Sequence, residues 1–228
     1  AGVRVGRAIA EALGRAGYTL VLHAHRSLSQ AEALARTLRA SGGEARVVQA
    51  DLSTAEGPVA LARAVGPKLD LLVNSAAAYA HARFADITSA ELEQMWAVNV
   101  RAPFLLTQAL LPALRGGCVV NVTDMAVSHA YTPTHFFSHY LATKAALEQL
   151  TRAWALELGP DIRVNAVAPG PVAMAEETTG GQRDDILRRI PLRRAGSPAD
   201  VAQAVLFFAG APYVTGQTLR VDGGLSVS

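Results

Sequence analysis

Short β-rich runs alternate with longer helical patterns along almost the whole chain of 228 residues. This alternation is typical of a parallel sheet with helices on both faces, because each return to a parallel strand needs a long crossover. The expected strands, several of them continuously apolar, are Tyr18–His23, Ala45–Gln49, Leu69–Val73, Gly117–Val122, Ile162–Ala166 and Gln217–Val221. The expected helices are Gly6–Arg15, Ser29–Ala40, Gly57–Val65, Ser89–Arg115, Tyr140–Leu158 and Ala199–Ala209. The pattern predicts an α/β fold, with residues 1–228 forming a single doubly wound domain.

The chain opens on a helix pattern, where a doubly wound sheet has its central strand and first turn. Residues Ala1 to Gly6 lead directly into Arg7-Ala8-Ile9-Ala10. Without a central strand, the neighbouring strands would keep unpaired and buried backbone groups, which is costly. We therefore expect about 8–15 further residues upstream of Ala1, comprising an apolar strand and the first turn residues.

Composition excludes several classes of protein. Half of the residues are apolar and the net charge is only +2, so we expect a folded core. Arg101 and Pro103 interrupt the most apolar stretch, and no leader pattern opens the chain, so we expect neither a membrane span nor a secretory signal. Basic residues are interleaved with acidic ones, which argues against nucleic-acid binding despite a pI near 8.9. The single cysteine, Cys118, predicts a buried thiol and fits a reducing cytoplasm.

The sharpest chemical feature is the pair Tyr140 and Lys144. A spacing of four residues places the phenol and the ammonium on one face of a helix. A nearby cation stabilises a phenolate, so we expect Lys144 to lower the pKa of Tyr140 and to let it donate and regain a proton near neutrality. The alternative is a packing tyrosine beside a solvated lysine.

Polar residues and glycines follow several predicted strands, at the carboxyl edge where open α/β sheets bind ligands. These segments are Asp51-Leu52, Asn74-Ser75-Ala76, Pro169-Gly170 and Val221-Asp222-Gly223-Gly224. Asn99 lies inside an apolar helix pattern, where a buried amide needs a hydrogen-bonding reason.

In this order the motifs resemble those of the short-chain dehydrogenase/reductases over essentially the whole chain. The resemblance implies a Rossmann sheet, a nicotinamide cofactor and hydride transfer. It also implies that Tyr140 is the acid/base, that Lys144 binds the nicotinamide ribose, and that Asn99 holds a proton-relay water. The cofactor contacts that we expect are Arg4, Val5, Gly6, His25, Arg26, Ser27, Asp51, Leu52, Asn74, Ser75, Ala76, Tyr140, Lys144, Pro169 and Gly170.

Within that family the chain is most similar to the pteridine reductases. The similarity rests on Arg4 in the glycine turn, on His25-Arg26-Ser27 after the first expected strand, and on Asp124 where the family usually has a serine. Tyr79 stands where pteridine reductases place an aromatic ring that stacks on the pterin.

The chemistry of these residues supports the similarity. Arg26 and Ser27, with His25, suit a 2′-phosphate and favour NADPH over NADH. Arg4, beside a helix start, suits a pyrophosphate or an anionic substrate edge. Tyr79 can stack on a flat heterocycle. Asp124 can carry the proton that accompanies hydride transfer to a C=N bond if burial raises its pKa, so we expect substrate contacts at Arg4, Tyr79, Asp124 and Tyr140.

The leading prediction is thus an NADPH-dependent pteridine reductase acting on pterin or dihydrofolate-like heterocycles. The alternative is a short-chain ketone reductase, for example of 3-oxoacyl thioesters, in which Ser128 or Thr123 polarises the carbonyl and Asp124 is structural. A catalytically silent nucleotide-binding regulator is a third hypothesis, disfavoured by the Tyr140 and Lys144 pair.

Four further expectations concern loops, metal binding and assembly. The spacing from Asp124 to Tyr140 exceeds the family's, so we expect the loop Ala130–Ser138 to bulge over the cleft. His135 and His139 lack a convincing third ligand, so no metal is expected. The polar segment Ala173–Pro191 is interpreted as a mobile lid. The helices Ser89–Arg115 and Tyr140–Leu158 carry excess apolar surface, and the resemblance implies that they pair in a homotetramer.

Overall fold

The computed structural model describes residues 1–128, 137–172 and 180–228. Parallel strands form its middle layer, as the sequence predicts. The strands are β1 (Leu20–Ala24), β2 (Ala45–Gln49), β3 (Leu71–Asn74), β4 (Cys118–Val122), β5 (Arg163–Pro169) and β6 (Thr218–Val221). The helices are α1 (Arg4–Arg15), α2 (Leu28–Ala40), α3 (Glu56–Arg63), α4 (Ser89–Trp96), α5 (Ala102–Leu110), α6 (Ser138–Glu157), α7 (Gly180–Arg189) and α8 (Pro198–Gly210). The α/β class and the parallel strand direction are therefore confirmed.

The strands are divided between two sheets. One sheet pairs β1 with β2, and the other has the order β3-β4-β5-β6. Within the described residues, β1 and β3 each pair with one neighbour only. Every crossover returns to a parallel strand, so the carboxyl ends of β3, β4 and β5 meet at one edge.

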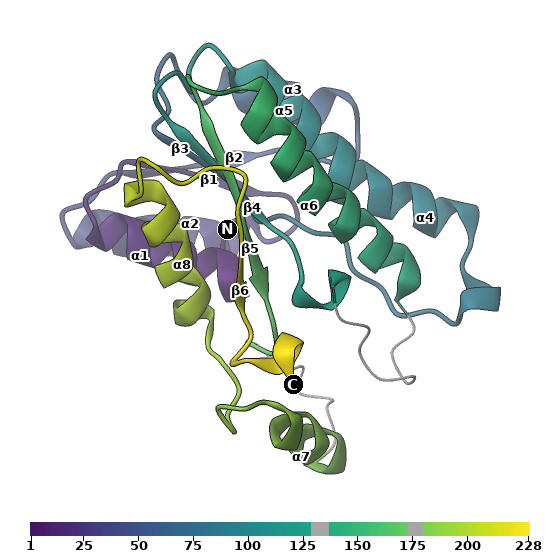
Figure 1. The fold of residues 1–228 in the computed structure, drawn as a ribbon. Helices are drawn as coiled ribbons and strands as arrows, with labels where there is room; N and C mark the ends of the chain where they lie inside the picture. Colours follow the sequence, from purple (N-terminus) through teal and green to yellow (C-terminus); the bar gives the residue numbers. More distant parts are fainter. Residues whose placement is uncertain (129–136, 173–179) are drawn as a thin grey trace.

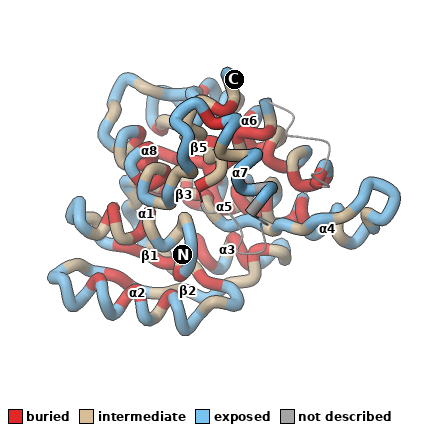
Figure 2. The backbone as a smooth tube through the Cα atoms, turned by 90° about the horizontal axis from the view of Figure 1, so that it is seen from below, coloured by how far each residue is buried: buried red, intermediate tan, exposed pale blue. Residues whose placement is uncertain are grey.

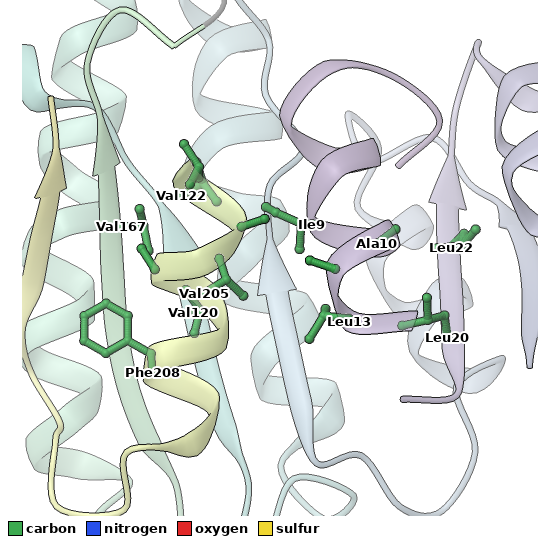
Figure 3. Close-up of a cluster of buried hydrophobic side chains, with 14 of the residues drawn as sticks. Ile9, Ala10, Leu13, Leu20, Leu22, Val120, Val122, Val167, Val205 and Phe208 are labelled. Atoms are coloured by element: carbon green, nitrogen blue, oxygen red, sulfur yellow. The ribbon is translucent and has the colours of Figure 1, made fainter. Parts of the chain in front are cut away.

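Helices cover the strands from both sides. Figure 1 shows α1 and α8 on one side and α5 and α6 on the other. Figure 3 shows Ile9 and Leu13 of α1 between β1 and α8, in the largest of the hydrophobic clusters of described residues. The cluster on the opposite face joins α3, α5 and α6 to β4 through Leu61, Leu106 and Trp154. Figure 2 shows the resulting pattern, with buried residues along the strands and the inward faces of the helices.

The prediction of one continuous helix over Ser89–Arg115 is wrong. The chain forms α4, then a π-helical turn over Ala97–Arg101, then α5, which ends at Leu110. Pro103 has no amide proton for the carbonyl of Asn99 four residues earlier, and its ring crowds that carbonyl. The helix therefore widens where Asn99 sits, which is a common feature of functional sites.

Part of the segment Ala173–Pro191, which is interpreted as a lid, forms a helix that the sequence analysis did not predict. Gly180–Arg189 is the helix α7, which sequence patterning missed because its glycines and charged residues give no apolar stripe. Residues 173–179 and most of the loop Ala130–Ser138 lie outside the described residues, so both the lid and the bulge stay predictions. No described helix has the length and apolarity to cross a membrane.

Candidate active site at the carboxyl edge of the strands

One large cavity brings the predicted site residues together. It has a volume of about 2170 Å³, follows β1 and β3 over their whole length, and reaches the carboxyl ends of β4 and β5. Its lining includes Arg4, Val5, Gly6, His25, Arg26, Ser27, Asp51, Leu52, Asn74, Ser75, Ala76, Tyr79, Asp124, Tyr140, Lys144, Pro169 and Gly170. All predicted cofactor and substrate contacts therefore face one space. Asn99 lies behind this lining, fully buried.

Asp124 and Tyr140 form the chemical centre of the cavity. Asp124 follows β4 directly, and its Oδ1 accepts a hydrogen bond of 2.9 Å from the Ala126 amide at the start of a 3₁₀ turn. Tyr140 lies in the first turn of α6, and its Oη donates to Asp124 Oδ2 at 3.2 Å. Burial raises the pKa of Asp124 and outweighs these hydrogen bonds and the charge of Lys144.

Lys144 lies one helical turn beyond Tyr140 and is only 2% exposed. Its Nζ donates to the Val122 carbonyl at 2.8 Å and lies 5.7 Å from the centroid of the Tyr140 ring. Burial disfavours the charged ammonium and lowers its pKa to about 8, although Asp124 acts in the opposite direction.

The expectation that Lys144 lowers the pKa of Tyr140 is wrong for this structure. Burial raises the pKa of Tyr140, and so do the negative charge of Asp124 and the hydrogen bond to it. A phenol that donates to a carboxylate would become an anion beside an anion on losing its proton. Lys144 instead directs its ammonium to the end of β4.

Asn99 holds the loop after β3 against α6. Its Oδ1 accepts from the Ala78 amide at 2.7 Å, and its Nδ2 donates to the Ala78 carbonyl at 3.0 Å. Nδ2 also donates to Thr143 Oγ1 at 2.9 Å. The side-chain amide is thus occupied by protein groups, and the water-holding role of Asn99 stays a prediction.

A second buried amide relay, which sequence analysis missed, supports the same edge. Asn74 Nδ2 donates to Asn121 Oδ1 at 2.9 Å, and Asn121 Nδ2 donates to Thr151 Oγ1 at 2.9 Å. The relay ties the end of β3 to β4 and to α6 beneath the cavity. An asparagine inside the apolar run Val119–Val122 was the available signal.

Aromatic rings form one wall beside Tyr140. The Tyr79 ring is 54% exposed and meets the Tyr140 ring edge to face, with centroids 4.9 Å apart. Its Oη is hydrogen-bonded to His81 Nε2 at 2.7 Å. Burial and the charge of Asp124 raise the pKa of Tyr79, whereas the charge of Arg4 lowers it. Sequence analysis singled out Tyr79 but not His81 or Phe137, whose ring centroids lie 5.7 Å apart.

The start of α1 and the residues after β1 offer an anion site in the same cavity. The α1 helix begins at Arg4, with no side-chain cap at Val3 and no acidic residue in its first turn, so its positive end is uncompensated by its own residues. Arg4 has a backbone φ of 49°, a strained conformation that favours glycine. His25, Arg26 and Ser27 follow β1 and line the same cavity. This set of donors and positive charge suits phosphate groups.

The Pro169-Gly170 motif has a packing reason beside its place in the lining. A Cβ atom at position 170 would lie 2.7 Å from the Cβ of Asp222, so only glycine fits. The Gly170 amide donates to the Val221 carbonyl at 2.9 Å. Gly170 therefore packs closely against Val221 and Asp222 at the ends of β5 and β6.

The hydroxyls of Thr123 and Ser128, which a ketone reductase would use, form hydrogen bonds with other groups. Thr123 is buried, and its Oγ1 donates to the Val167 carbonyl at 3.3 Å. Ser128 Oγ donates to the Met125 carbonyl at 3.2 Å and accepts from Arg220 Nε at 2.9 Å. Asp124 is the side chain that meets Tyr140.

Only one of the two histidines considered as metal ligands lies within the described residues. His135 lies outside the described residues, and His139 is buried at the start of α6. In the part of the chain that is described, no three histidine, cysteine, aspartate or glutamate residues form a metal-binding group.

Comparisons with known proteins agree with this arrangement. A family model described as enoyl-(acyl carrier protein) reductase matches residues 2–226. An uncharacterized oxidoreductase of Mycobacterium tuberculosis is 36% identical over an alignment of 235 positions, which covers 97% of this chain and 88% of the relative. The crystal structure of FolM alternative dihydrofolate reductase 1 from Brucella canis, complexed with NADP, has a TM-score of 0.90 and 33% identity, covering 100% of this chain and 91% of that one. A crystal structure of a putative betaketoacyl-ACP reductase has a TM-score of 0.86 and 37% identity, covering 100% and 95%.

Proposed function

Because the chain belongs to the short-chain dehydrogenase/reductase family of oxidoreductases, we propose that it is an NADPH-dependent reductase of a pterin or dihydrofolate-like heterocycle. The observation that carries the proposal is the hydrogen bond of 3.2 Å between Tyr140 and Asp124. A buried carboxyl beside the tyrosine gives the site a second proton carrier, which reduction of a C=N bond can use. A similar solved structure is named an alternative dihydrofolate reductase, which supports this substrate class.

The cavity suits NADPH. The open amino end of α1 and Arg4 would hold the pyrophosphate, and Arg26 with His25 and Ser27 would hold the 2′-phosphate. Lys144 would hydrogen-bond the nicotinamide ribose. When bound, the reduced nicotinamide supplies a hydride.

Asp124 and Tyr140 would provide the proton of the reaction. Their raised pKa values keep both groups protonated more readily than in water. In reduction of a C=N bond, the ring carbon would accept the hydride and this pair would donate the proton to the ring nitrogen. Tyr140 Oη then stabilises the carboxylate that Asp124 becomes, and solvent returns the proton.

Tyr79 would orient the substrate. Its ring is about half exposed within the cavity and lies next to Tyr140, so a flat heterocycle can stack on it with its nitrogen edge near Asp124. Arg4 acts electrostatically on the same ring and is suited to an anionic substrate edge.

Reduction of a ketone, for example a 3-oxoacyl thioester, is the second candidate. The similarity to a putative betaketoacyl-ACP reductase favours it. It would need a hydroxyl group to polarise the carbonyl together with Tyr140, whereas the hydroxyls of Thr123 and Ser128 bond other partners.

Replacement of Asp124 by serine separates the two candidates. We expect D124S to reduce turnover of 7,8-dihydrobiopterin by roughly 100-fold or more, because a general acid is removed. Turnover of an acetoacetyl thioester by D124S would be unchanged or improved. NADPH oxidation is the measurement for both proteins and both substrates.

The opposite outcome, in which the wild type reduces only the thioester, would make Asp124 structural and the protein a ketone reductase. Turnover of either substrate would exclude a catalytically silent regulator.

We further propose that the protein assembles as a homotetramer. Exposed apolar side chains on α4, α5 and α6 support a subunit interface there, among them Trp96, Phe104 and Leu156. Cys118 is buried, which fits a protein that works in a reducing cytoplasm without disulfides.

A further inference from the structure

His81 belongs to the aromatic wall, where its ring contacts Tyr79 and Phe137, without being part of the proton chemistry. Tyr79 and His81 stand two residues apart in the loop after β3, which has no regular secondary structure there. Their rings meet edge to face, with centroids 5.0 Å apart and planes at 85°. Phe137, at the start of α6, packs edge to face on His81.

The Tyr79 ring needs such support because it is about half exposed on a loop. A side chain that stacks on a substrate loses its rotational freedom on binding unless the protein has already fixed it. The described contacts that restrain this ring are the edge-to-face contact with Tyr140, the tilted contact with Phe137 and the bond of 2.7 Å to His81. The bond to His81 is the directional one among them.

We propose that His81 is a positioning residue that fixes the Tyr79 ring for stacking and thereby gives the site its preference for flat ring substrates. This inference rests on the proposed function, because it assumes that the substrate stacks on Tyr79. A flexible ketone does not need an oriented aromatic face, so its reduction does not depend on His81.

The test compares H81A with the wild type. Loss of one hydrogen bond and of preorganisation is expected to raise the KM for 7,8-dihydrobiopterin roughly 5- to 10-fold. The kcat stays within about twofold because Asp124 and Tyr140 are untouched. The affinity for NADPH, measured by fluorescence titration, stays unchanged. R83A, an exposed position two residues further along the same loop, is the matched control and keeps the wild-type KM.

A double-mutant cycle with Y79F shows whether His81 acts through the Tyr79 hydroxyl. In the Y79F background, H81A is expected to change the KM by less than about twofold, because the bond is already absent. H81Q keeps a hydrogen-bonding group at this position and is expected to recover most of the lost affinity.

Additive effects of H81A and Y79F, or a wild-type KM in H81A, would overturn the role of His81 while leaving the proposed function intact. A wild-type protein that binds NADPH and does not reduce the pterin would contradict the proposed function itself, and this inference with it.

Discussion

Lys144 carries a charge into a site where its side chain is almost fully buried. Its pKa in the folded protein is about 8, below the value of 10.5 for an exposed lysine. Well below pH 8 both states are protonated, so the buried charge opposes folding in full. Between pH 8 and 10 the folded state loses its proton first, the unfolded state binds more protons, and the free energy of unfolding therefore rises with pH.

Comparison with K144M isolates this contribution. Relative to K144M, the wild type is expected to gain roughly 2–3 kcal/mol of unfolding free energy between pH 8 and 10, at 1.36 kcal/mol for each pH unit. Urea denaturation at a series of pH values measures the difference, and other groups that titrate in both proteins cancel. A difference that does not change with pH would contradict the lowered pKa.

Arg26 tests the cofactor half of the site. Removal of a charge-assisted contact to the 2′-phosphate by R26A is expected to weaken NADPH binding roughly 10- to 100-fold and to leave NADH binding almost unchanged. R36A, on the exposed side of α2, is the control. Equal losses for the two cofactors would show that Arg26 does not contact the phosphate.

The residues of the site were predictable to different degrees. The meeting of Asp124 and Tyr140 could be predicted from the family resemblance, which puts both in the active site, and from the place of Asp124 directly after a strand. The direction in which the pKa of Tyr140 shifts could not be predicted, since it depends on burial and on which charge lies closer to the hydroxyl. His81 was missed because a loop has no periodicity that reveals the contacts of its side chains.

At the scale of helices and strands, repeating patterns were readable and interruptions were not. The last helix was predicted from Ala199, and α8 begins one residue earlier at Pro198, where Asp200 Oδ2 accepts hydrogen bonds from the amide and the hydroxyl of Ser197. The π-turn around Asn99 was not predictable, because Arg101 and Pro103 leave the apolar spacing on either side intact.

Helix α8 ends without a glycine cap and depends on a strand residue. Arg163 of β5 donates to the Phe208 carbonyl at 2.7 Å and to the Ala209 carbonyl at 3.1 Å, so it satisfies the last turn of α8 and compensates its negative end. R163M is expected to lower the free energy of unfolding by about 1–2 kcal/mol in urea denaturation.

R7M, which removes only the exposed ion pair of Arg7 with Glu11, serves as the control and is expected to cost less than about 0.5 kcal/mol. Equal effects of R163M and R7M would mean that the end of α8 does not need Arg163.

At the scale of the whole molecule, alternation of strands and helices was sufficient to predict the α/β class. It was not sufficient to predict how the strands pair, because apolar strands covered on both faces carry no register signal of their own. The pairing of β1 with β2 and the order β3-β4-β5-β6 therefore emerged only from the structure.

Assembly is testable at the same scale. Leu156 is 86% exposed on α6, and we expect such side chains to be buried between subunits of a tetramer. Sedimentation velocity is expected to give a tetramer for the wild type and smaller species for L156R. L192R, at an exposed leucine after α7, is expected to remain tetrameric. A wild-type monomer at all concentrations would contradict the proposed assembly.

The central claim is that the protein reduces a pterin-type ring with NADPH at the carboxyl edge of its strands. The most direct test measures NADPH oxidation and tetrahydrobiopterin formation together, in wild-type protein supplied with 7,8-dihydrobiopterin. The account predicts equimolar consumption of NADPH and formation of tetrahydrobiopterin, with both abolished in Y140F. NADPH oxidation with an acetoacetyl thioester and none with the pterin would contradict it.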